Sequence, residues 1–330
     1  MPTPAEEPEN THGAQIRPQC GREHECACAR SRAGNDLETL LADPGFRGTL
    51  LGEDVVSLGA HLPLLDQVVG VTVAGPVIVN DVGVHEIPVL TGGPIRCDPS
   101  RITLRLNPAR LGSALITEPQ AHIPPTLRLF DADGNTAHAT YLTEFSDRLA
   151  FEAIALAAGR TAAAPPETPR PQPTTCTGSA LEDQITQLDD VLSDGGIRRL
   201  ASMPAHAAKG FTRVESRQVI ATLEYAALHN LSVTVTAAAP GCLQMRHDRL
   251  DAAREHRGQV ILASGGSRVM INFNLVTECW VTWSQGVWGP TGSIEIYDRH
   301  AQCSMVITQT GAVEPAMFYA WQRLLENLTA

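Results

Sequence analysis

Four residues near the N-terminus have types and spacing suited to a metal site. Cys20, His24, Cys26 and Cys28 form the pattern C-x3-H-x-C-x-C. Thiolate and imidazole groups are good ligands for transition metals such as zinc and iron. Structural zinc sites, however, place their cysteine pairs inside a folded turn, whereas this cluster stands in a polar segment without apolar periodicity. A solvated tail is therefore the simpler interpretation, with a metal site as its alternative, and we assign no metal ligand from the sequence.

Arg105 is the cation whose position the sequence predicts best. Ile102, Leu104 and Leu106 alternate with polar residues, a pattern typical of a strand with one buried face. Arg105 would then project from the opposite face. A guanidinium there can bind a carboxylate through two parallel hydrogen bonds. An ordinary solvated arginine is the alternative.

Four histidines are further candidates, because imidazole binds metals and exchanges protons near neutral pH. His206 stands in an expected loop between the first two helices of the C-terminal half, and His247 follows an arginine. His85 and His138 stand in strand-like segments, where neighbouring backbone groups can satisfy a buried histidine. The sequence contains no residues whose spacing supports a nucleophile triad, a phosphate-binding loop or a paired-carboxylate site. No catalytic residue is therefore assigned.

The elements that must position these residues have the patterns of an α+β fold. Leu127–Phe130 and Ala137–Leu142 are predicted strands, and the Asp133-Gly134 turn between them predicts a hairpin. Many such strands joined by hairpins indicate large antiparallel sheets with flanking helices. We interpret the pair Asp189-Asp190 as the surface of a helix, and Cys242 as a buried thiol.

Two helices have start signals in the sequence. We expect Ser146 to cap a helix whose apolar stripe includes Leu149, Ala153 and Ile154. We expect Ser216 to cap a second helix in the same way.

The two halves of the folded chain look alike. Placing residues 126–144 over 293–311, an offset of 167, brings Phe130 onto Tyr297 and Asp131 onto Asp298. The same offset places residues 100–102 over 267–269 without a gap. We infer an internal duplication. Unrelated strands that share apolar alternation are the alternative.

Segments poor in bulky side chains mark the expected boundaries. Residues 1–34 are polar and aperiodic, which predicts a disordered tail. Residues 160–178 contain five prolines and predict a semi-extended linker. We therefore expect one domain over 35–159 and a second, similar domain over 179–330.

Composition excludes several classes of function. The net charge of -11 and the pI of about 5.4 argue against a nucleic-acid partner. No apolar stretch approaches the length of a membrane span, and the N-terminus lacks the pattern of a secretory signal. The eight cysteines then indicate reduced thiols, and we expect a cytoplasmic protein without membrane insertion.

The segment Leu127–Ile154 resembles the strand–turn–strand–helix unit of the HemS/ChuX-type haem-utilisation proteins. His138 and Tyr141 fall on that family's "V-H-K-x-Y-L" pattern. Three further segments are similar to family motifs, in order along the chain: Val84-His85-Glu86, Leu104-Arg105 and Gly241-Cys242-Leu243-Gln244. The resemblance covers about residues 50 to 328, both halves, as in the duplicated full-length members.

The resemblance implies two similar α+β halves that hold haem between them, in cytoplasmic haem utilisation and iron acquisition. Haem would be a carried ligand or a substrate for degradation, and the choice between carrier and enzyme stays open. A haem-uptake transporter or a haem oxygenase would be its protein partner. Haem needs an axial ligand and groups for its propionates. Arg105, His247, His206 and His85 are the residues that we expect to contact it.

The chain departs from the family pattern at the expected axial ligand. The family's "H-x-F-F-x-x-L" helix corresponds to residues 186–192, which puts Thr186 where the ligating histidine would stand. The family's "I-H-T-G" has become Met245-Arg246-His247-Asp248. The alternative function is therefore a diverged paralogue that keeps the fold, has lost haem binding and acts as an interaction or regulatory protein.

Overall fold

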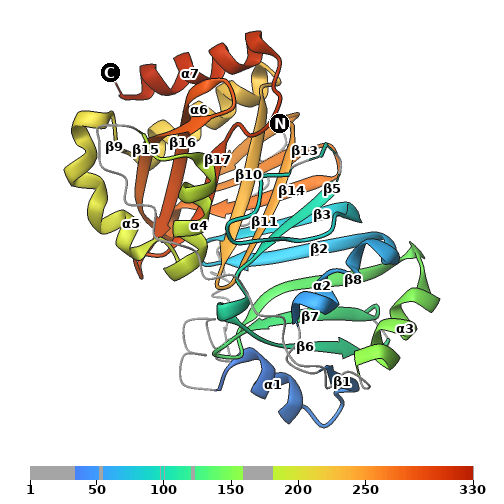
Figure 1. Ribbon diagram of the computed structural model, residues 1–330. Helices are drawn as coiled ribbons and strands as arrows, with labels where there is room; N and C mark the ends of the chain where they lie inside the picture. Colours follow the sequence, from blue (N-terminus) through green and yellow to red (C-terminus); the bar gives the residue numbers. More distant parts are fainter. Residues whose placement is uncertain are drawn as a thin grey trace, which may run out of the picture. The chain divides into compact units, whose positions relative to one another are not determined.

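The computed structural model describes residues 34–51, 55–96, 98–99, 101–119, 123–158 and 181–329. The predicted tail, the predicted linker and the Cys20/His24/Cys26/Cys28 cluster lie outside these residues. The chain from Asn35 onward forms one compact unit (Figure 1). Among the described residues, no helix is both long and apolar enough to span a membrane.

The first sheet has nine strands, which are antiparallel to their neighbours. In spatial order they are β1 (Gly48–Leu51), β6 (Leu111–Thr117), β7 (Thr126–Asp131), β8 (Thr136–Ser146), β2 (Asp66–Ala74), β3 (Val77–His85), β14 (Ser267–Asn272), β13 (Gln259–Ser264) and β12 (Ala252–His256).

The second sheet has eight strands. In spatial order they are β4 (Val89–Leu90), β5 (Arg101–Leu106), β11 (Cys242–Arg249), β10 (Ser232–Ala239), β17 (Cys303–Thr308), β16 (Gly289–Asp298), β15 (Val276–Gly286) and β9 (Thr212–Val214). The start of β5 also pairs with the end of β3, so the two sheets are continuous there.

Strand pairing confirms the internal duplication and corrects its offset. Leu127 pairs with Thr140 in β7–β8, and Ile294 pairs with Ile307 in β16–β17, so these hairpins repeat at 167 residues. Upstream the predicted offset is wrong. The β2–β3 hairpin, which pairs residues 74 and 77, recurs in β10–β11 at residues 239 and 242, and therefore 165 residues later. Two additional residues between β15 and β16 account for the difference.

Each half supplies strands to the sheet of the other half, β12 to β14 to the first sheet and β4 and β5 to the second. Met270 of β14 lies opposite Ile78 of β3, and Arg105 of β5 lies opposite Leu243 of β11. These two pairs are equivalent under the 165-residue offset, so the exchange is reciprocal and in the same register. The two halves are thus joined by backbone hydrogen bonds, and the domain boundaries drawn from the sequence stay a prediction.

The strand exchange makes a testable prediction about the separated halves. Residues 35–159 and 181–330, produced as two chains in one cell, should co-purify as a one-to-one complex, because each leaves a strand edge of the other unpaired. Size-exclusion chromatography and circular dichroism measure the association and the folding. Two well-folded monomers that do not associate would contradict the prediction.

Three apolar clusters lie between the sheets and their helices. In the first half, β-strand side chains pack against α2 (Val55–Gly59), the 3-10 helix η2 (Leu62–Leu65) and α3 (Arg148–Ala158). In the second half, one face of the sheet packs against α6 (Ser216–Leu228) and α7 (Pro315–Thr329). The other face packs against α4 (Gln184–Asp194) and the 3-10 helix η4 (Met203–Lys209). The second sheet is therefore buried on both faces.

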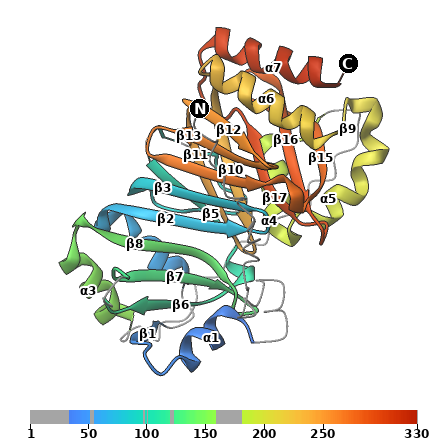
Figure 2. The same ribbon diagram turned by 180° about the vertical axis from the view of Figure 1, so that it is seen from behind.

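The first sheet, by contrast, has an exposed face. Val73, Ile78, Met270 and Ile261 stand opposite one another across four adjacent strands and are 38–53% exposed. Figure 2 shows this side of β2, β3 and β8 without a helix over it. The remaining described helices are α1 (Asp36–Ala42), α5 (Ile197–Ser202) and the 3-10 helices η3 (Pro108–Arg110) and η5 (Phe273–Leu275).

The predicted helix details need correction. α3 begins after Asp147, whose carboxylate accepts the Ala150 amide, while the Ser146 hydroxyl bonds elsewhere. Ile154 of the predicted stripe is buried, together with Phe151, but Leu149 is 78% exposed and Ala153 is exposed as well. α6 is capped by Glu215 in a capping box rather than by Ser216.

Candidate functional site

Arg105 lies on β5 and contacts helix α4 at the start of the second half. Its Nε donates a 2.6 Å hydrogen bond to Oδ1 of Asp189, and its Nη1 donates to the Gly93 carbonyl at 3.0 Å. The other Asp189 oxygen accepts the Gly92 amide at 2.7 Å. The side chain of Arg105 is 2% exposed, which excludes the alternative of an ordinary solvated arginine.

The backbone around Gly92 is set by the pairing of β4 with β5. Val89 lies beside Arg105 in a parallel ladder, and the chain then turns so that the Gly93 amide donates to Leu90. Gly92 has a φ of +80°, a conformation that glycine adopts without strain. The Gly93 carbonyl therefore accepts from Arg105, and the Gly92 amide donates to Asp189, from one short turn.

Helix α4 carries Asp189 to this turn. Asp183 caps the helix by accepting the Thr186 amide, and Leu188, Val191 and Leu192 are buried against the sheet. Asp189 is thus not simply the helix surface that the sequence predicted. Thr186, three residues earlier and so on the same side of the helix, is exposed. The position of the expected iron ligand therefore neighbours the Arg105 site but holds a hydroxyl.

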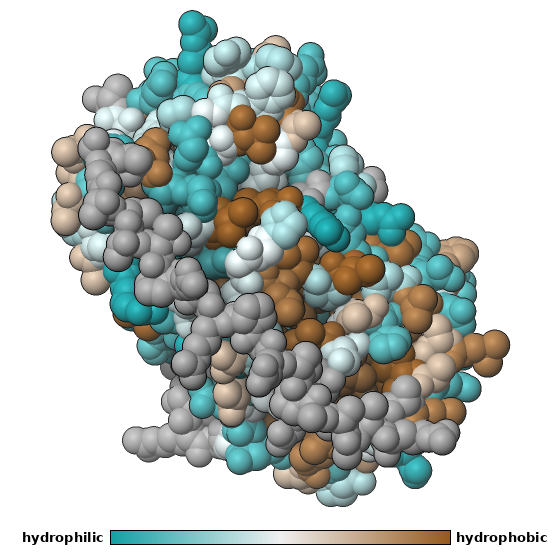
Figure 3. Space-filling view, in the orientation of Figure 1, coloured by the Kyte–Doolittle hydropathy of each residue, from teal (hydrophilic) through white to brown (hydrophobic). Residues whose placement is uncertain are grey.

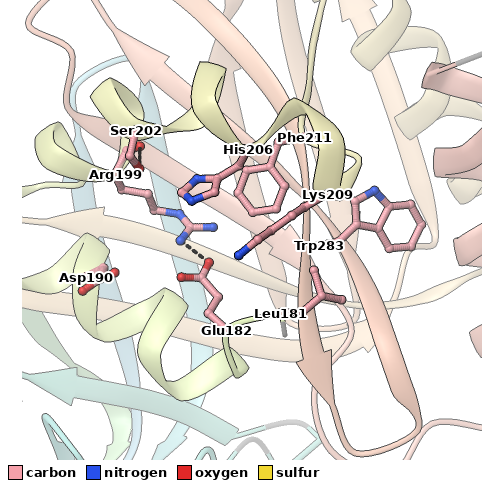
Figure 4. Close-up of a pocket in the computed structure, with 9 residues that line it drawn as sticks. All are labelled: Leu181, Glu182, Asp190, Arg199, Ser202, His206, Lys209, Phe211 and Trp283. Atoms are coloured by element: carbon pink, nitrogen blue, oxygen red, sulfur yellow. Dashed lines mark hydrogen bonds and ion pairs between the residues drawn. The ribbon is translucent and has the colours of Figure 1, made fainter. Parts of the chain in front are cut away.

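His206 lines a small cavity of about 150 Å³ in the second half (Figure 4). It lies in η4 rather than in the expected loop, with its ring 5.4 Å from that of Phe211. Figure 4 shows Lys209 and the Glu182–Arg199 ion pair facing the same cavity. Ligand pockets usually measure about 300–1,000 Å³, so this cavity as it stands is too small for haem.

The wall of that cavity is a buried ionic network. Arg199 donates through Nε and Nη2 to Glu295, which is fully buried, and Tyr297 donates to the same carboxylate at 2.7 Å. Burial opposes ionisation of Glu295, but the charge of Arg199 holds the pKa of that carboxyl below its usual value. Burial also raises the pKa of Glu182. The network ties α5 to β16 and is structural in character.

His85 and His138 form a buried pair. The Thr140 hydroxyl bridges their Nε2 atoms at 3.0 and 3.1 Å, and the rings stand edge to face at 5.4 Å. The Thr72 hydroxyl contacts Nδ1 of His138 at 2.9 Å. Burial lowers the pKa of His85 to about 3 and the pKa of His138 well below its usual value, so both are neutral at pH 7. These contacts support the sheet-histidine interpretation.

His247 lies on β11 and is partly buried. Its Nδ1 stands 3.0 Å from the Thr234 hydroxyl, and burial lowers its pKa. No hydrogen bond or ring contact among the described residues joins His247, His206, His85 or Arg105 to one another. The four candidates therefore do not contact one another directly, and their contact with haem stays a prediction.

The residues that sequence reasoning missed are the partners of Arg105. Asp189 gave no signal beyond its place in an acidic pair, and Gly92 stands in an unremarkable turn. In the described ranges, no cluster of three or more His, Cys, Asp and Glu side chains is arranged to hold a metal ion. The site that the geometry supports is consequently a carboxylate-binding arginine at the junction of the two halves.

Two known crystal structures share this fold. Apo-PhuS, a haem-binding protein from Pseudomonas aeruginosa, aligns with a TM-score of 0.70 over 89% of this chain and 91% of its own, at 18% identity. ChuS, the haem-degrading enzyme of Escherichia coli O157:H7, aligns with a TM-score of 0.67 over 89% and 90%, at 15% identity. No protein-family model and no curated sequence matches the chain. The likeness confirms the predicted HemS/ChuX-type duplicated fold.

Proposed function

We propose that this chain is a haem-binding protein of haem utilisation and iron acquisition, acting in the cytoplasm as a haem carrier. The observation that carries the proposal is the shared fold with PhuS and ChuS over about nine-tenths of all three chains. Fold alone does not determine chemistry, so the proposal also depends on the residues at the junction. A haem-uptake transporter or a haem oxygenase would exchange haem with it.

The junction residues are better suited to binding a haem propionate than to ligating the haem iron. Arg105 is a buried cation whose Nη2 has no partner among the described residues, which suits a propionate. The threonine at position 186 is not among the usual axial ligands of haem iron. We therefore propose binding through the propionates and the apolar faces of the porphyrin, with weak or non-standard ligation, and assign no catalytic residue.

The second candidate function is that of an interaction or regulatory protein that has kept the fold without the ligand. Asp189 favours it, because its carboxylate already occupies Arg105 and would repel an approaching propionate. Thr186 favours it as well. Degradation of haem has no specific residue in its support.

Haemin titration, followed by the Soret absorbance, tests the proposal. Arg105→Ala should weaken binding by about tenfold or more, because hydrogen bonds to charged groups contribute about 1.5–3 kcal/mol. Thr186→His should strengthen binding and produce a histidine-ligated spectrum. Arg198→Ala is the matched control, since Arg198 is 81% exposed on α5. Unchanged titrations in both test variants would remove this site, and no Soret change in the wild type would favour the second function.

A further inference from the structure

The contact between Asp189 and β5 has the geometry of a bound carboxylate. Oδ1 accepts from Nε of Arg105 at 2.6 Å, and Oδ2 accepts from the Gly92 amide at 2.7 Å. Each oxygen therefore has its own donor, and the two donors come from different segments of the first half. Charge-assisted hydrogen bonds of this length are among the strongest in proteins.

The donors are held in place independently of the acid. Arg105 is fixed by its strand pairs, Val89 on one side and Leu243 on the other, and by its bond to the Gly93 carbonyl. The Gly92 amide is oriented by its left-handed turn. Neither donor depends on helix α4, so the donor pair persists if Asp189 moves away.

The acid is the more exposed partner. The side chain of Asp189 is 21% exposed, whereas that of Arg105 is 2% exposed. Open space lies beside Gly92, where a Cβ would meet no atom within 4 Å. Asp189 can consequently turn into water, but Arg105 would then stay buried without an anion, which is costly. The buried guanidinium of Arg105 therefore requires another anion whenever Asp189 leaves it.

Apolar surface adjoins the donor pair. Ile95, two residues after Gly93, packs against the cluster that contains Leu188 of α4 and Leu243 of β11. Figure 3 shows hydrophobic side chains gathered across the middle of the face that Figure 1 presents, in the region of β5 and α4. A ligand with a carboxylate at the edge of an apolar body matches this arrangement.

We propose that Arg105 and Gly92 form a binding site for a ligand carboxylate, and that Asp189 occupies this site as an internal competitor. The inference rests on the proposed haem-binding function, for which a haem propionate is that carboxylate. Binding replaces the Asp189 carboxylate by the propionate at the same two donors, and the released Asp189 is hydrated at the surface. Asp189 thereby sets how strongly a carboxylate ligand must bind before the site opens.

The test compares two probes that differ only at their carboxylates, haemin and haemin dimethyl ester. Asp189→Asn removes the competing charge and nearly preserves the shape of the side chain. Asp194→Asn is the matched control, because Asp194 is on the same helix, is 23% exposed and pairs with the exposed Arg198. Haemin should bind D189N about tenfold more tightly than the wild type, whereas the ester should change by less than about threefold. D194N should resemble the wild type with both probes.

A second readout does not depend on spectra. D189N leaves Arg105 buried without its anion, so its melting temperature should be lower than that of the wild type, and haemin should raise it more than the ester does. If D189N does not fold without ligand, Asp189→Ser replaces it in the same comparison.

The outcomes separate this inference from the function on which it rests. The internal competitor is overturned if the wild type binds haemin and D189N binds haemin with the same affinity, or if the affinities for haemin and for the ester change equally in D189N. The haem-binding proposal then still stands. Binding of haemin by D189N but not by the wild type supports the competitor. Absence of haemin binding in both proteins overturns both proposals.

Discussion

Replacing Arg199 by methionine lowers the free energy of unfolding by about 3–5 kcal/mol, the usual cost of removing one partner of a buried ion pair. The substitution leaves Glu295 fully buried without its cation, and Glu182 loses the same partner. Urea unfolding followed by circular dichroism measures the effect. Adding Glu295→Gln to the variant should restore part of the stability, because no uncompensated buried carboxylate then remains at that position.

Arg198→Met is the control for this experiment. Arg198 is the neighbouring residue on α5, is 81% exposed and pairs with Asp194, the last residue of α4. Surface substitutions of this kind usually change stability by less than about 0.5 kcal/mol. Equal losses in the two variants would contradict a structural role for the Arg199 network.

Acid should destabilise the protein through the His85–His138 pair. The unfolded chain takes up protons as the pH falls below about 6.5, whereas the folded pair stays neutral, with the pKa of His85 at about 3. Stability is therefore fully present above pH 6.5 and is lost as the pH falls toward 3. Each histidine contributes a slope of about 1.4 kcal/mol per pH unit, or about 2–3 kcal/mol between pH 6 and pH 4.

Other titratable groups near the pair require a control. Burial raises the pKa of Asp81 and of Glu86, and both effects oppose the histidines, because the folded state then binds protons more readily. His138→Gln leaves these two carboxyls in place and removes one titrating imidazole. Its unfolding free energy is measured in urea from pH 7 to pH 4. The slope against pH should be smaller than that of the wild type by about 1.4 kcal/mol per pH unit, because unfolding takes up about one proton fewer. Parallel slopes would exclude the histidine pair as the cause.

Local patterns in the sequence determined the strands, their hairpins and the duplication. Alternation from Ile102 to Asn107 predicted a strand that the structure confirms as β5, and the Asp133-Gly134 turn predicted a hairpin that it confirms at β7 and β8. Alternation and turn residues act over a few positions, so they can be recognised without tertiary information. The two-residue shift of the offset was missed because it occurs in the connection between strands, where no pattern constrains the length.

Only the tertiary structure decided that helices cover both faces of the second sheet and leave one face of the first sheet exposed. An antiparallel strand with alternating side chains is commonly solvated on one face, so the sequence left open whether Arg105 binds a carboxylate or is solvated. Helix α4, η4 and the residues between them instead bury that face of the second sheet, so Arg105 and Glu295 both become buried charges with partners on the helices. Those partners are 84 and 96 residues away in sequence, a separation over which no local pattern carries information. The periodicity of one strand reports which side chains share a face, but the contacts of that face depend on the packing of the whole fold.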